Sequence, residues 1–342
     1  MRRCILPLLS MVFLMAMGFS RAEAAEPDRC ISSALVLPLL GGAGDTPIIP
    51  VRVENRDAAM YLSTAFDRIY VRNLRNFNFH DGHGDLFHDE RHEVIVQVNG
   101  YHSEEARQIV IDDFQIGKVQ AGPVNAIQLF SEGAQSVDGR PLVGVLGVVA
   151  FTNLQVLLDI PHRQVAFLTM SDSADCHDAA RDLMGKNAHA VEVSEDFQIP
   201  VTIDGKTRWV RPNPDLSSTV LPGAWGDLPE LSPSAVGKGE LTVTHYDTFT
   251  TTGRRLSLAD FRMDGVRLSD GPVAVQRDIQ WAMLGLPFFE NRVVLFDYPH
   301  HRFYFAPSET VSRPAGHDLH FEATIGGVVS IRERRGKSRQ DG

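Results

Sequence analysis

The sequence predicts a mostly β protein that contains two similar domains in tandem. The segment VLGVVAFTNLQVLLDIPHRQVAFL (145–168) recurs without a gap as MLGLPFFENRVVLFDYPHHRFYFA (283–306), at a constant spacing of 138 residues. Two other segments, 48–64 and 198–214, alternate apolar and polar residues on both sides of a turn, which predicts a β-hairpin in each. Apolar residues make up 43% of the chain and charged residues 22%, a balance typical of folded globular proteins. A duplicated β-rich domain is the simplest interpretation of both repeats.

The two copies are predicted to contain the same elements in the same order. Each hairpin turns at a polar pair, Glu54-Asn55 or Asp204-Gly205. A β region punctuated by glycine and aspartate follows, and then a Leu-Gly turn with a short helical segment. A strand pair joined by Asp-x-Pro-His completes the copy, because proline and its polar neighbours favour a turn. The predicted boundaries are 31–170 for the N-terminal domain, 171–195 for a polar linker, 196–310 for the C-terminal domain and 311–342 for a tail.

Residues 1–24 are predicted to be a secretory signal peptide. Arg2 and Arg3 precede a mostly apolar stretch, and Ala22-Glu23-Ala24 supplies the small residues that a signal peptidase recognises. An uncleaved membrane anchor is the alternative, although the apolar run is short for a helical span, which needs roughly 20 residues. We therefore expect a periplasmic or secreted protein that is cleaved near Ala24 and keeps no stable membrane span.

Cleavage of the signal peptide would leave two cysteines, Cys30 and Cys176. An oxidising compartment would allow them to form a disulfide, which would tie the mature N-terminus to the linker. Two unpaired thiols are the alternative. The formal net charge of −10 argues against nucleic acid or an anionic membrane surface as the main partner.

The succession of hairpin, apolar strand, Leu-Gly turn and closing Asp-x-Pro strand pair resembles the pepsin and retropepsin-like superfamily of aspartic proteases. The likeness spans roughly residues 46–307 and is greatest to bacterial secreted forms with two such domains in one chain. It implies two tandem β-barrel domains, related by a pseudo-two-fold axis, with a cleft between them. In that family each domain contributes one aspartate from an Asp-Thr/Ser-Gly-Ala/Ser motif, and the two carboxylates share a proton and activate a water. No cofactor is expected.

The family motif falls on Ser63-Thr64-Ala65-Phe66 in the first copy and on Asn213-Pro214-Asp215-Leu216 in the second. Neither Ser63 nor Asn213 is a carboxylate, so neither can take the proton of a nucleophilic water near neutral pH. The resemblance therefore favours a non-catalytic protein whose cleft binds an extended peptide or an envelope partner by β-augmentation. The expected cleft residues are Thr64, Ser217, Ser218, Trp209 and Trp225.

Two alternatives remain open. Asp215 lies two positions after Asn213, a shift that keeps a side chain on the same face of a strand, and Asp67 is the nearby carboxylate of the first copy. An active aspartic endopeptidase with a rearranged dyad is therefore the first alternative. The second is a periplasmic metal-binding protein, since a short acidic segment contains four histidines, although their spacing matches no standard zinc motif. These histidines are His80, His83, His88 and His92.

Overall fold

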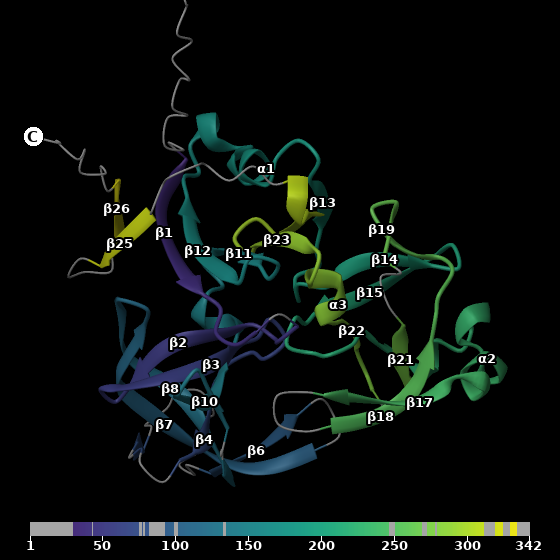
Figure 1. Ribbon diagram of the computed structural model, residues 1–342, viewed down its shortest axis with the longest axis horizontal. Coiled ribbons are helices and arrows are strands. Elements are labelled where there is room, and N and C mark those ends of the chain that lie inside the picture. Colours follow the sequence, from purple (N-terminus) through teal and green to yellow (C-terminus); the bar gives the residue numbers. More distant parts are fainter. Residues whose placement is uncertain are drawn as a thin grey trace, which may run out of the picture.

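The computed structural model of the protein is mostly β, as the sequence predicts (Figure 1). It describes residues 30–310, apart from 43, 75–76, 78, 82–92, 99–101, 133–134, 246–249, 269–271 and 278, together with two strands at 319–323 and 329–333. The strands form one six-stranded sheet, two nine-stranded sheets and a separate two-stranded hairpin. Among these residues no helix has the length and apolar character required to cross a membrane.

The N-terminal half forms a nine-stranded sheet in which six strands close into a barrel. Around the barrel the order is β2–β3–β10–β4–β8–β7, and β7 then pairs with β2, where Val51 lies opposite Ile116. The pairs β3–β10 and β4–β8 are parallel, and the remaining pairs of the barrel are antiparallel. The strands of this sheet are β2 (Ile48–Val53), β3 (Arg56–Leu62), β4 (Ile69–Asn73), β5 (His80–Asp81), β6 (Glu93–Val98), β7 (His102–Ile116), β8 (Val119–Glu132), β9 (Ser136–Val137) and β10 (Arg140–Leu146).

The C-terminal half forms a second nine-stranded sheet, which is open. Its order is β17–β18–β21–β16–β22–β15–β14–β19–β20. The strands are β14 (Ile199–Ile203), β15 (Lys206–Pro212), β16 (Val220–Pro222), β17 (Glu240–His245), β18 (Thr250–Leu256), β19 (Phe261–Met263), β20 (Val266–Arg267), β21 (Val273–Gln276) and β22 (Ala282–Leu284). Three short helical segments, η3 (Gly223–Trp225), η4 (Pro229–Leu231) and α2 (Pro233–Lys238), lie between β16 and β17.

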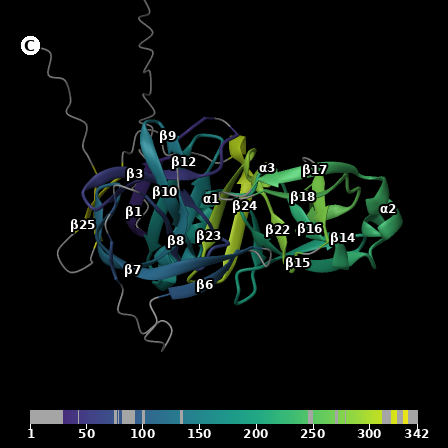
Figure 2. The same cartoon turned by 90° about the horizontal axis from the view of Figure 1, so that it is seen from below.

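A six-stranded antiparallel sheet joins the two halves, which lie side by side in Figure 2. At its centre β11 of the first copy pairs with β23 of the second, with Val156 opposite Phe296. The sheet order is β1 (Ile31–Pro38), β12 (Gln164–Met170), β11 (Gln155–Asp159), β23 (Arg292–Asp297), β24 (Arg302–Pro307) and β13 (His189–Glu192). The other short segments are η1 (Val148–Ala150), η2 (Ala174–Cys176), α1 (Ala179–Met184), α3 (Leu286–Phe289), η5 (Ser308–Thr310), β25 (Leu319–Ala323) and β26 (Val329–Glu333).

Strand connectivity repeats between the halves, as the sequence repeat predicts. Both predicted hairpins form, as β2–β3 and β14–β15, and the residues at their turns have positive φ. The parallel pairs β3–β10 and β4–β8 of the first half correspond to the parallel pairs β15–β22 and β16–β21 of the second. Both closing strand pairs also form, as β11–β12 and β23–β24.

The two nine-stranded sheets differ in closure, because the first contains a barrel and the second is open. In the first half β7 and β8 run without interruption for 15 and 14 residues, which allows β7 to reach β2. In the second half the chain leaves the sheet between β18 and β19 and again between β20 and β21. Ile203 and Phe261 still pair, as Val53 and Phe114 do, but the interruptions leave an open sheet in place of a second barrel.

One large hydrophobic core continues from the barrel through the six-stranded sheet into the C-terminal half. It includes Ile49 and Leu62 of the barrel, Phe151 beside η1, and Phe289 and Phe296 of the second copy, all at most 1% exposed. Since burial of a large apolar side chain contributes about 1.5–3 kcal/mol, this continuous core fixes the two halves relative to each other.

The predicted disulfide is confirmed: Cys30 and Cys176 are bonded. Cys30 immediately precedes β1, and Cys176 ends η2 in the predicted linker. The linker segment is more ordered than its polar composition suggests, because it contains α1 and also β13, an edge strand of the six-stranded sheet. The predicted tail contains the hairpin β25–β26, and residues 334–342 lie outside the described part of the chain.

Candidate functional site

Two short loops, one from each copy, meet where β3 and β15 end. The first loop begins at Ser63 and the second at Asn213. The backbone N–H of Ser63 donates to the carbonyl of Leu146 at 3.0 Å, and the N–H of Asn213 donates to the carbonyl of Leu284 at 2.8 Å. The two residues thus have equivalent positions, one beside the end of β10 and the other beside the end of β22.

A second pair of backbone bonds fixes the far side of each loop. The N–H of Val148 donates to the carbonyl of Phe66, and the N–H of Leu286 donates to the carbonyl of Leu216, both at 2.8 Å. Each loop is therefore held on both sides by the Leu-Gly turn of its own copy. These bonds give residues 63–66 and 213–216 equivalent positions in the two copies. The sequence motif predicts the same alignment.

One hydrogen bond connects the two loops directly. The hydroxyl of Thr64 donates to the backbone carbonyl of Pro212 at 2.5 Å. Thr64 follows Ser63, and Pro212 precedes Asn213, so this contact brings Ser63 and Asn213 together at the seam between the two halves. The second copy has Pro214 where the first has Thr64, and proline lacks a hydroxyl that could return the bond.

Ser63 and Asn213 are fully buried at the seam, with 0% and 1% of their surface exposed. The Ser63 hydroxyl oxygen accepts weak hydrogen bonds from the backbone N–H groups of Ala65 at 3.2 Å and Phe66 at 3.3 Å. The Asn213 amide nitrogen points to the sulfur of Met283 at 3.7 Å. Both side chains are neutral at every physiological pH, so this pair cannot take up a proton from a water molecule.

The two carboxylates considered for a rearranged dyad have different surroundings. Asp215 is buried, with 4% of its surface exposed. The Asp67 side chain is 70% exposed and accepts a hydrogen bond from the Tyr70 hydroxyl at 2.8 Å. Burial, together with the charge of Asp67, raises the pKa of Tyr70, so this hydroxyl stays protonated as the donor. Asp67 therefore has its own partner within the first copy.

The polar residues after the second motif brace the loop. Ser217 is exposed, whereas the Ser218 hydroxyl lies 2.9 Å from the hydroxyl of Thr244 on β17. The Thr219 hydroxyl accepts a hydrogen bond from the backbone N–H of Gly285 at 3.1 Å. Of the expected cleft residues in this run, Ser217 is the one whose side chain faces solvent.

Two of the three tryptophans near the second loop, Trp225 and Trp281, lie against arginine side chains. Trp209 on β15 is 46% exposed, and the Arg208 guanidinium lies 5.8 Å from the ring of Trp225. Trp281, before β22, is 41% exposed and carries the Arg211 guanidinium 4.3 Å above its ring. Each of these cation–π pairs fixes the position of one tryptophan ring.

The predicted metal segment is largely outside the described residues. His83, His88 and His92 fall within 82–92, and only His80 can be placed. Its Nε2 lies 3.3 Å from a carboxylate oxygen of Asp112. Within the described part of the chain no group of three or more metal-ligating side chains gathers.

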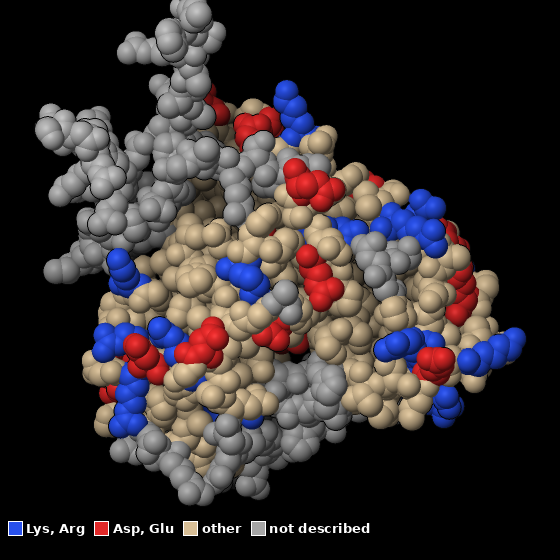
Figure 3. Space-filling model, viewed as in Figure 1, with Lys and Arg blue, Asp and Glu red and all other residues tan. Residues whose placement is uncertain are grey.

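Acidic and basic side chains are interspersed on the face of the molecule shown in Figure 3.

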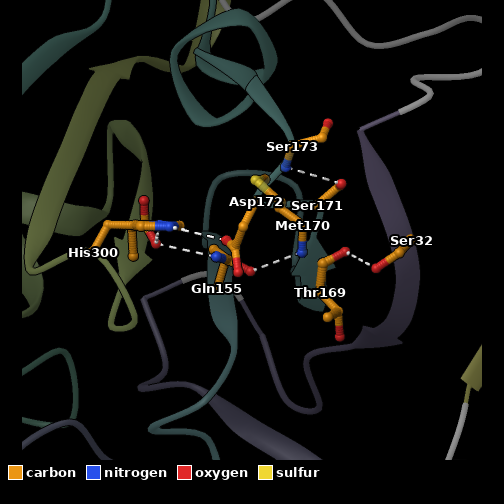
Figure 4. A network of polar contacts seen from close by, with 9 residues as sticks. Ser32, Gln155, Thr169, Met170, Ser171, Asp172, Ser173 and His300 are labelled. Atoms are coloured by element: carbon orange, nitrogen blue, oxygen red, sulfur yellow. Dashed lines mark hydrogen bonds and ion pairs between the residues drawn. The ribbon is translucent and has the colours of Figure 1, made fainter. Parts of the chain in front are cut away.

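Sequence reasoning missed Pro212 as the acceptor of the inter-loop bond, because a backbone carbonyl leaves no trace in residue type. It also gave no functional weight to His300, which the repeated Asp-x-Pro-His turn contains. His300 Nδ1 lies 2.8 Å from buried Asp297, and its Nε2 lies 3.3 Å from Asp172 (Figure 4). Gln155 of the first copy donates to the same Asp297 oxygen at 3.1 Å, so this network links the two copies.

The His300 network predicts a mild dependence of stability on pH. Partial burial lowers the pKa of His300, but the hydrogen bond and charge of Asp297, followed by those of Asp172, raise it more, so the pKa lies above its usual value. The stabilisation is therefore complete below about pH 6.5, the unfolded pKa, and is lost as the pH rises through the folded pKa. Since the ring is 47% exposed, we expect the unfolding free energy measured by urea titration to change by less than about 1 kcal/mol across this pH range. Asp172→Asn should flatten the pH profile between pH 6 and 8, and an unchanged profile would contradict this assignment.

Loss of the Thr64 hydroxyl should destabilise the seam. Thr64→Val keeps the shape of the side chain but leaves the Pro212 carbonyl without its donor, which costs about 1–2 kcal/mol of unfolding free energy. Thr64→Ser is the matched control, because it retains the hydroxyl and should lose well under half as much. Urea unfolding followed by circular dichroism measures both variants. Equal losses for valine and serine would show that packing, and not this bond, determines the effect.

The sequence matches no protein-family model and none of the curated proteins with which it was compared.

Proposed function

We propose that this protein is a secreted or periplasmic, non-catalytic relative of the pepsin-like aspartic proteases. In this proposal the two halves are tandem pepsin-like domains about an approximate two-fold axis, and the cleft between them binds an extended peptide or an envelope partner. The observation that carries the proposal is the Thr64–Pro212 bond, which joins the two equivalent loops at the positions occupied by Ser63 and Asn213.

The chemistry of the seam supports binding over hydrolysis. Ser63 and Asn213 are neutral side chains, and neither takes up a proton from water. An extended peptide satisfies its main-chain groups by adding to a strand edge, and alternate side chains then enter pockets. β17 is the terminal strand of the C-terminal sheet, and Leu241 and Val243 on it are 70% and 49% exposed.

A combined cleavage and binding experiment with β-casein, an unfolded protein that presents extended segments, tests the proposal. We expect no cleavage between pH 3 and 7, and no pepstatin-sensitive activity. Pepstatin-sensitive cleavage that Asp215→Asn abolishes would establish the alternative, an endopeptidase with a rearranged dyad, and would overturn the proposal.

Binding is measured at pH 7 by tryptophan fluorescence, because all three tryptophans, at positions 209, 225 and 281, belong to the C-terminal half. Ser217→Trp introduces a bulky side chain at the exposed position of the second loop and should weaken β-casein binding about tenfold, a loss of about 1.4 kcal/mol. Ser234→Trp on α2, also exposed, is the control and should bind as the wild type does. Binding that Ser217→Trp leaves unchanged would place the peptide elsewhere.

A further inference from the structure

A cavity of about 640 Å³ opens in the wall of the N-terminal barrel. Its lining comes from β4, β7, β8 and η1 and is mainly apolar, with Ile69, Ile109, Phe114, Ile116 and Val124 as its larger side chains. The volume lies within the range of about 300–1,000 Å³ that is usual for small-molecule sites. Because protein interiors are close-packed, an apolar space of this size in a barrel is a feature that requires an explanation.

Strand pairing explains how the barrel opens here. β8 pairs with β7 along almost its whole length, from Val119 to Leu129. On its other side β8 pairs with β4 only from Ile127 onward, where Tyr70 lies opposite. The first half of β8 therefore has no described strand on that side. The loop that leads into β4 and the η1 segment diverge from β8 there and form the opposite wall of the cavity.

The internal repeat draws attention to one small residue of the lining. Ala150 of η1 lines the cavity, and at the constant spacing of 138 residues it corresponds to Phe288 of the second copy. Phe288 is 3% exposed, and its ring contacts Phe303 and Phe305 of the six-stranded sheet. The first copy thus has a methyl group at a position where the second copy has an aromatic ring.

The lining contains one basic and one acidic side chain, Arg68 and Asp67. Arg68 is the single cation among the lining residues, and its side chain is 26% exposed. Its Nε lies 3.5 Å from Asp67, whose carboxylate also accepts the Tyr70 hydroxyl. A guanidinium presents several N–H donors in a planar fork that suits a carboxylate or phosphate head group. The cavity therefore combines an apolar interior with an anion-recognising group at its edge.

We propose that this cavity binds the acyl chain of an anionic amphiphile, such as a long-chain fatty acid, with the head group beside Arg68. The chain lies against β7 and β8, where apolar side chains exclude water from it. This binding site is separate from the proposed peptide cleft, and neither proposal depends on the other.

Fluorescence titration of the whole protein with cis-parinaric acid, a fluorescent fatty acid, tests the proposal, with oleate as the competitor. Ala150→Phe transfers the residue of the second copy into the first and should weaken binding at least tenfold. Ala224→Phe, at an exposed position of η3, is the control and should bind as the wild type does. If Ala150→Phe does not fold, Val149→Trp fills the same wall from a position that is 54% exposed and should give the same loss.

The head group is tested separately. Arg68→Gln should weaken displacement by oleate about tenfold and leave displacement by oleyl alcohol, which has the same chain and no charge, unchanged. Equal effects on oleate and oleyl alcohol would overturn the role of Arg68. No binding by the wild type, or wild-type affinity in a folded Ala150→Phe or Val149→Trp protein, would overturn the site itself.

Discussion

Replacing both Cys30 and Cys176 by serine should lower the free energy of unfolding by about 3–5 kcal/mol. The disulfide closes a loop with a sequence separation of 146 residues, which spans the whole N-terminal half. Cross-linking so long a loop removes much conformational freedom from the unfolded chain, and the estimate for a loop of about 100 residues is already near 4.7 kcal/mol. The disulfide also holds the start of β1, an edge strand that pairs only with β12 among the described strands.

Guanidinium unfolding of the double variant, and of the wild type with and without a reducing agent, measures the effect. The reduced wild type should match the double variant, because both lack the cross-link and keep the same strands. Loss of the pairing between β1 and β12 should appear as faster amide hydrogen exchange at Leu35 and Leu37, which lie opposite Phe167 and Val165. A double variant within about 0.5 kcal/mol of the oxidised protein would show that the disulfide is not a major source of stability.

The repeat made much of the fold predictable. Strand periodicity and the matched turns were enough to place both hairpins and both closing strand pairs. These are local structures, and their turns contain Asn, Asp, Gly or Pro, which favour turns. The cysteine pair was predictable for a similar reason, since only two cysteines follow the predicted signal peptide. All of these features depend on residue types that are close in sequence or rare in the chain.

Closure of the first sheet was not predictable in the same way. Whether a sheet closes depends on whether a long strand continues until it meets its first neighbour, as β7 does at β2. In the second half Leu258, between β18 and β19, is buried with 4% exposure, so the chain leaves the sheet to fill the core. An apolar residue in an alternating segment fits either outcome, and only the three-dimensional packing decides between them.

The equivalence of the two loops was predictable, and the contacts between them were not. Alignment of the two copies placed Ser63 opposite Asn213, and the backbone hydrogen bonds to Leu146 and Leu284 agree with that alignment. The contact between Thr64 and Pro212 joins residues 148 positions apart, and the acceptor is a backbone atom. The barrel cavity was not predictable for another reason. The difference between Ala150 and Phe288 is visible in the repeat, but the sequence does not show that Ala150 lies near β8.

Substitution of Gly147 or Gly285 by alanine should be among the most damaging single changes in the protein. The two glycines are equivalent in the repeat, and each lies in the Leu-Gly turn that holds one loop of the seam. A Cβ at Gly147 would overlap the carbonyl oxygen of Arg68 and lie 2.6 Å from that of Phe66. A Cβ at Gly285 would overlap the backbone carbonyl of Ser218. Because these neighbours are backbone atoms, the clash cannot be relieved by rotation of a side chain.

We expect each alanine variant to lose about 3 kcal/mol or more of unfolding free energy, since overpacking against backbone forces the loop to move. Gly237→Ala on α2 is the matched control: nothing lies within 4 Å of its added Cβ, and in a helix alanine is favoured over glycine by up to about 1 kcal/mol. Urea unfolding of the three variants should therefore give two large losses and one small gain.

Since Gly147 and Gly285 position the loops of Thr64 and Pro212, the double variants Gly147→Ala/Thr64→Val and Gly285→Ala/Thr64→Val should lose less than the sum of their single losses. Additive losses in both double variants would show that the turns and the inter-loop bond act independently.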